Sequence, residues 1–146
     1  MDPRIKRLKT VEACKRFAAN AKRLDRPDLA DQARKRGVEI KAEIHDAKTA
    51  AEKECLQAIY AYEEILSAKN GRTTRASRTW QMIDRHGILG AVERAVNRPQ
   101  ETVGYTALVE MGLEEFAFEA VILRHPDKFS DDAVARSKER LKDWAR

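Results

Sequence analysis

Apolar residues recur every three or four positions along most of this chain, which is the spacing of one face of an α-helix. The clearest case is the segment 49–69. Its apolar face consists of Ala51, Cys55, Leu56, Ala58, Ile59, Tyr62, Ile65 and Leu66. Asn70-Gly71 follows directly, and glycine is a common left-handed terminator of helices. The pattern therefore predicts a long helix over 49–69 that ends at Gly71.

The preceding residues predict two more helices. One extends from about Thr10 to Leu24, with Phe17 on its apolar face. Arg26-Pro27-Asp28 then breaks the pattern, and proline is favoured in the first turn of a helix. A second helix is expected from Pro27 to about Ile44.

The segment after Gly71 combines an apolar stripe with a basic face. A helix is expected over 74–85, with Thr73 or Thr74 as its N-terminal cap. Gly87 separates it from a short apolar helical segment over 88–97. Three apolar residues of the first segment share one stripe, namely Ala76, Trp80 and Ile83. On another side lie Arg75, Arg78 and Arg85, flanked by Gln81 and Met82.

The last third of the chain begins at the boundary marked by Pro99. Short helices are expected around Tyr105 to Met111 and around Phe116 to Leu123, and Ser130 is expected to cap a final helix, 131–144. We predict an all-α protein, a compact array of six or seven short helices. Residues 1–98 form a basic helical region, and residues 99–146 form an acidic helical module packed on the same core.

Charge is distributed unevenly along the 146 residues, whose net charge is +5. Residues 1–49 contain 14 Lys/Arg against 8 Asp/Glu, and residues 72–98 contain 6 against 2. Residues 99–146 are acidic, with 7 Lys/Arg against 10 Asp/Glu. Segregated basic charge favours binding to polyanionic partners more than an evenly charged surface would.

The helices 49–69 and 74–85, joined by a glycine turn, have the proportions of a helix-turn-helix. In that arrangement the second helix enters the major groove of DNA. The expected contacts come from Arg72, Thr73, Arg75, Arg78, Gln81 and Arg85. We therefore predict a small DNA-binding accessory or regulatory protein whose partner is duplex DNA. The alternative is a helical adaptor that binds another protein through its acidic module or through exposed apolar residues such as Met82.

The sequence carries no signature of an enzyme, a metal site or a membrane protein. Cys14 and Cys55 are too few and too far apart for a disulfide framework or a zinc site, and each fits a buried free thiol. The three histidines lack metal-ligand spacing, and no glycine-rich phosphate loop is present. No cofactor is expected. The absence of a long apolar run and of a signal peptide predicts a cytoplasmic protein with no membrane contact.

His125-Pro126-Asp127 resembles the tripeptide of J-domain co-chaperones, which stimulates a chaperone ATPase from a loop between two helices. Here too the tripeptide lies between two predicted helices. The preceding helix is acidic, with Glu114, Glu115 and Glu119, whereas that of a J-domain is basic. A helix that stops before Pro126 explains the same residues more simply.

Overall fold

The computed structural model describes residues 1–98 and 102–144, and within these residues it contains helices and no strands. The α-helices are α1 (Pro3–Lys6), α2 (Val11–Arg23), α3 (Pro27–Glu43), α4 (Ala50–Asn70), α5 (Ser77–Asn97), α6 (Thr102–Glu110), α7 (Phe118–Arg124) and α8 (Asp131–Trp144). Two 3₁₀ turns, η1 (Glu114–Phe116) and η2 (Pro126–Lys128), flank α7. The all-α prediction is confirmed.

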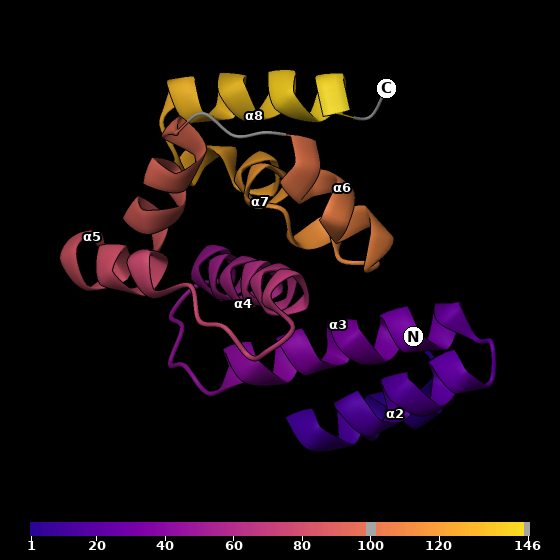
Figure 1. Cartoon of the computed structure of the whole chain (residues 1–146). Coiled ribbons are helices and arrows are strands. Elements are labelled where there is room, and N and C mark those ends of the chain that lie inside the picture. The colour runs from indigo at the N-terminus through magenta and orange to yellow at the C-terminus, as the bar shows by residue number, and fades with distance from the viewer. Residues whose placement is uncertain (99–101, 145–146) are drawn as a thin grey trace.

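Helix α4 lies at the centre of the fold, between the pair α2–α3 on one side and α5 to α8 on the other (Figure 1). One core cluster joins α4 to α5, α7 and α8 around Ile59, Val92 and Ile122. A second joins α3 and α4 to α6 and η1 around Val38 and Leu113. Because α4 contributes to both clusters, it needs a wide apolar surface, as its sequence predicts.

Side-chain caps and a glycine define several helix ends, including those predicted at Ser130 and Gly71. Thr10 and Thr49 cap α2 and α4 by accepting the backbone N–H groups of Ala13 and Glu52, both at 3.1 Å. Ser130 caps α8 through the N–H of Ala133, also at 3.1 Å. Gly71 ends α4 in the left-handed conformation, with φ +68°. Helix α1 is only one turn long, so the spacing of its apolar residues does not predict it. Its Ile5 is nevertheless fully buried.

Both cysteines are buried free thiols, as predicted. Burial raises the pKa of Cys55 to about 12 and also raises the pKa of Cys14. We expect neither thiol to react with a disulfide reagent at pH 8 in the folded protein, because the thiolate is the reactive form. Two equivalents should react in denaturant, and the same colorimetric titration measures both. Rapid reaction of the native protein would contradict this packing.

No helix in residues 1–98 or 102–144 combines the length and the apolar character that crossing a bilayer requires.

Candidate nucleic-acid interface

A buried carboxylate on α4 fixes the start of α5. Glu63 has only 8% of its surface exposed. Its Oε2 accepts a hydrogen bond from the backbone N–H of Ala76 at 2.8 Å and another from Trp80 Nε1 at 2.6 Å. The prediction of a threonine cap at Thr73 or Thr74 is therefore wrong. The helix begins three residues later than expected, and a side chain from α4 takes the place of the local cap.

The connection between α4 and α5 is tied to α4 as well. The backbone N–H of Thr74 donates to Ser67 Oγ at 2.8 Å. The side chain of Asn70 donates to Thr74 Oγ1 at 3.1 Å. Residues 71–76 form a connection of six residues, longer than the three or four typical of a helix-turn-helix.

The apolar stripe of α5 anchors the helix as its spacing predicts. Trp80 and Ile83 pack against the central core cluster, and Ala76 is buried. The indole of Trp80 stacks on His45, with 5.4 Å between ring centroids, and lies 5.3 Å from the ring of Tyr60. His45 Nε2 and the Tyr60 hydroxyl are 2.6 Å apart, so the aromatic cluster is itself hydrogen-bonded. The opposite side of α5 is thereby directed outward.

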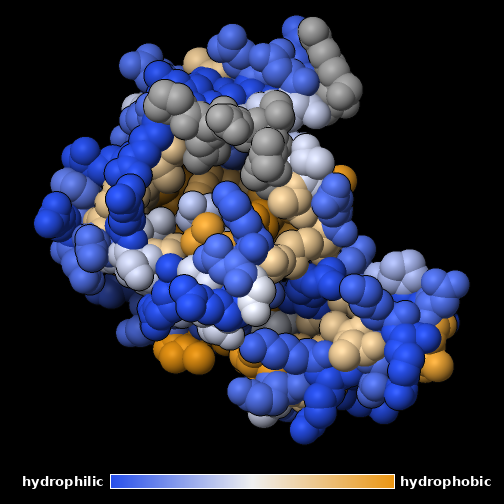
Figure 2. Space-filling model, viewed as in Figure 1, coloured by the Kyte–Doolittle hydropathy of each residue, from blue (hydrophilic) through white to orange (hydrophobic). Residues whose placement is uncertain are grey.

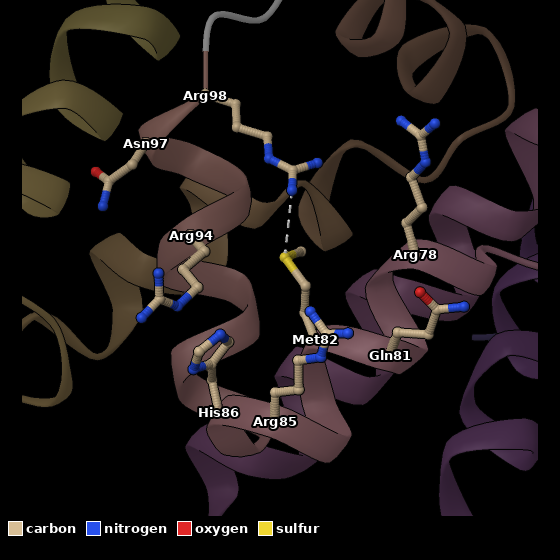
Figure 3. Close-up of a pocket in the computed structure, with 8 residues that line it drawn as sticks. All are labelled: Arg78, Gln81, Met82, Arg85, His86, Arg94, Asn97 and Arg98. Atoms are coloured by element: carbon tan, nitrogen blue, oxygen red, sulfur yellow. Dashed lines mark hydrogen bonds between the residues drawn. The ribbon is translucent and has the colours of Figure 1, made fainter.

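Gly87 bends α5 sharply. Its backbone, at φ +79° and ψ 173°, is not helical, so α5 consists of two limbs, residues 77–86 and 88–97. The sequence predicts the separation at Gly87 but not its consequence. The bend turns the second limb away from the axis of the first (Figure 3).

A basic hollow of about 630 Å³ opens between the two limbs. We call it the basic hollow, and it is lined by Arg78, Gln81, Met82, Arg85, His86, Arg94, Asn97 and Arg98. Figure 3 shows the first five of these on one limb and the last three on the other, around Met82. Among the described residues that line it, none is acidic.

The hollow contains half of the residues predicted to contact DNA. Arg78, Gln81 and Arg85 line it together. Arg72 and Thr73 lie in the exposed connection before α5 and are not among its lining residues. Arg75 lies next to Ala76, with its guanidinium 5.4 Å from the centroid of the Trp80 ring. It therefore stacks on the anchor of the helix and does not line the hollow.

Two arginines of the hollow are not among the residues predicted from the sequence. Arg94 and Arg98 are four residues apart, which places them on one side of a helix. That signal is present in the sequence, but the apolar residues of the segment 88–97 favour a core helix. Only the bend at Gly87 brings these side chains opposite Arg78 and Arg85.

None of the four arginines of the hollow makes an ion pair within the described residues. Glu63 and Glu64 of α4 are engaged elsewhere, since Glu63 binds Trp80 and Glu64 binds Lys41 at 3.1 Å. Arg98 donates through its guanidinium to the sulfur of Met82, at 3.6 Å, which leaves its charge unneutralised. No carboxylate of residues 1–98 or 102–144 therefore competes with an external anion for these guanidinium groups.

The basic residues of the N-terminal third are in a different situation. Six of the 14 are paired with carboxylates, namely Arg4, Arg26, Arg34, Lys35, Arg36 and Lys41. Pairing neutralises part of the charge of this region. Four of the partner carboxylates lie within residues 1–49 and are already counted in its net charge of +6, whereas Glu115 and Glu64 lie outside it. The six paired side chains are less available to an external anion than the arginines of the basic hollow.

The His125-Pro126-Asp127 tripeptide has a structural role. Pro126 begins the turn η2, and His125 hydrogen-bonds through Nε2 to the carboxylate of Glu54 on α4. The other carboxylate oxygen accepts a hydrogen bond from Arg124 Nε at 2.5 Å. These contacts join the end of α7 to the central helix.

This junction predicts a pH dependence of stability. Partial burial alone would raise the pKa of Glu54, but the hydrogen bonds from His125 and Arg124 outweigh burial and lower that pKa. A lowered folded-state pKa stabilises the fold above the unfolded pKa, and this contribution disappears as the pH falls through the folded value. We expect Glu54→Gln to reduce the loss of unfolding free energy between pH 5 and pH 3, measured by urea denaturation. An unchanged slope would contradict the pairing.

Comparison with protein-family models, curated proteins and solved structures finds no match to this chain. Within the described residues, no group of three or more His, Cys, Asp and Glu side chains could hold a metal ion.

Proposed function

We propose that the protein binds duplex DNA, with the phosphates of one strand seated in the basic hollow. The observation that carries the proposal is the convergence of four arginines, free of carboxylate partners within the described residues, on one concave surface. Arginine binds phosphate oxygens through a planar fork of donors, and such contacts supply most of the non-specific affinity for DNA.

The concave shape favours contact with the backbone over reading of the bases. A helix that enters the major groove must protrude, whereas the arginines of α5 line a hollow between two limbs. A sugar–phosphate strand is a ridge and fits such a hollow. Phosphate contacts position a protein but carry no sequence information. We expect similar affinities for duplexes of unrelated sequence, and contacts by Arg72, Thr73 and Arg75 remain a prediction.

The proposal is tested with a hollow variant, Arg78→Ala, Arg85→Ala and Arg94→Ala combined. Its matched control combines Arg7→Ala, Arg16→Ala and Arg23→Ala, three exposed arginines of the N-terminal third. Both variants lose three positive charges. Fluorescence anisotropy of a labelled duplex at several salt concentrations, after circular dichroism confirms folding, gives Kd and its salt dependence.

We expect the hollow variant to bind at least about tenfold more weakly than the wild type. Its slope of log K against log salt should become shallower by about 0.9 for each phosphate that the variant no longer neutralises. The Kd of the control variant and its salt dependence should differ much less from those of the wild type. If the wild type does not bind at low salt, or if both variants weaken binding equally, the proposal is wrong. The discovery of a protein partner in place of DNA would then support the alternative function, a helical adaptor that binds another protein.

A further inference from the structure

A second hollow, larger and mainly apolar, lies among α4, α5, α6, α7 and α8. Its volume is about 870 Å³, within the range of small-molecule pockets. We call it the apolar hollow, and its principal side chains are Tyr62, Ile65, Tyr105, Met111, Phe118 and Trp144. Figure 2 shows hydrophobic residues gathered in a depression in the middle of one face, with hydrophilic residues around it.

Aromatic pairs form two parts of its wall. The ring of Tyr62 lies edge-on to Phe118 at 6.0 Å, and that of Tyr105 lies 5.5 Å from Trp144. Tyr62 nevertheless keeps 37% of its surface exposed, so its ring is available to a ligand. All four side chains project from helices that pack on the core, which provides a wall that needs little reorganisation on binding.

The charges that line the apolar hollow favour an anion. Lys69 and Arg98 line it, and neither makes an ion pair within the described part of the chain. Glu119 also lines it, but Arg140 donates to its carboxylate at 3.2 Å. Glu110 of α6 also lines it, and both Glu110 and Lys69 are exposed, so their opposite charges offset each other. The guanidinium of Arg98 remains as the unpaired charge among the described residues of this hollow. Arg98 and Met82 also line the basic hollow, so the two hollows adjoin at these side chains.

We propose that the apolar hollow binds an amphipathic organic anion, with a hydrophobic body against the aromatic wall and a carboxylate at Arg98. A body of this kind removes apolar surface from water on both partners, which favours binding. The carboxylate then gains a charge-assisted hydrogen bond from a guanidinium that has no carboxylate partner within the described residues. This site does not depend on DNA binding.

The probes are decanoate, decan-1-ol and decylammonium, which share a ten-carbon chain and differ in the charge of the head group. Isothermal titration calorimetry is carried out below the micelle concentration and without DNA. We expect saturable 1:1 binding of decanoate, about tenfold tighter than decan-1-ol, with decylammonium weakest.

Three kinds of substitution locate the site. Arg98→Gln should weaken the binding of decanoate about tenfold and leave the binding of decan-1-ol unchanged. Arg85→Gln is the matched control, because Arg85 lines only the basic hollow, and it should change neither. Ala68→Trp, at an exposed position that lines the apolar hollow, should abolish binding of both by filling it. Ala107→Trp fills the hollow from α6 and provides an independent test.

The proposal is overturned if none of the probes binds saturably or if both tryptophan variants bind decanoate like the wild type. It is also overturned if Arg98→Gln leaves the preference for decanoate over decan-1-ol intact. Because these titrations contain no nucleic acid, they fail or succeed independently of the proposed DNA binding.

Discussion

Glu63→Ala is expected to lower the free energy of unfolding by about 3 kcal/mol, because it leaves two donors without their carboxylate. The backbone N–H of Ala76 and the indole N–H of Trp80 both donate to this side chain. Ala76 is buried and Trp80 is partly buried, so water cannot fully replace the missing acceptor. Urea denaturation followed by circular dichroism measures the change.

Glu64→Ala is the matched control for this experiment. Glu64 is the next residue of α4 and pairs with Lys41, both side chains being about one quarter exposed, and a partly solvated pair of this kind contributes about 1 kcal/mol. Glu63→Gln should retain part of the stability, since an amide oxygen can still accept. Equal losses for Glu63→Ala and Glu64→Ala would show that Glu63 does not fix the start of α5.

Gly112→Ala is the second substitution with a large expected effect, also about 3 kcal/mol. Gly112 follows α6 at φ +71°, a left-handed conformation that costs an L-residue about 1–2 kcal/mol. A Cβ atom there would also lie 2.6 Å from Cβ and Cγ of Asp31 on α3. Forcing these atoms apart adds about 1–3 kcal/mol and disturbs Arg34, which joins Asp31 to the carbonyl of Met111.

Gly71→Ala separates the cost of backbone strain from the cost of the steric clash with Asp31. Gly71 has nearly the same backbone, φ +68°, but a Cβ atom there would meet nothing within 4 Å. Its cost should therefore be that of the backbone alone, about 1–2 kcal/mol. Thermal and urea unfolding of the two variants under identical conditions give the comparison. If Gly71→Ala destabilises the protein as much as Gly112→Ala does, the close approach to Asp31 has no energetic consequence.

Local signals in the sequence predict much of the fold. Helix α4 is predictable because its periodic apolar face, its threonine cap and its terminal glycine agree. The break in α5 is also predictable, because a single residue, Gly87, carries the signal for it. The cap of α5 is not, since Glu63 lies 13 residues before Ala76 and only the packing of α4 brings them together.

The candidate site is predictable only in part, for the same reason. Arg78 and Arg85 belong to one helical face and can be grouped by spacing. Arg94 and Arg98 join them because Gly87 bends the chain, and the direction of a bend cannot be read from the identity of the glycine. The apolar residues of 88–97 therefore indicate a core helix, although Arg94 of this segment lines the hollow.

We propose that the two limbs of α5 together form the DNA-binding surface. The most direct test is a series of ¹H–¹⁵N correlation spectra of the wild type titrated with an unlabelled duplex. We predict shifts concentrated in the segments 78–86 and 94–98, with small changes in α2. Shifts concentrated in α1 and α2, or an unchanged spectrum at low salt, would contradict this claim.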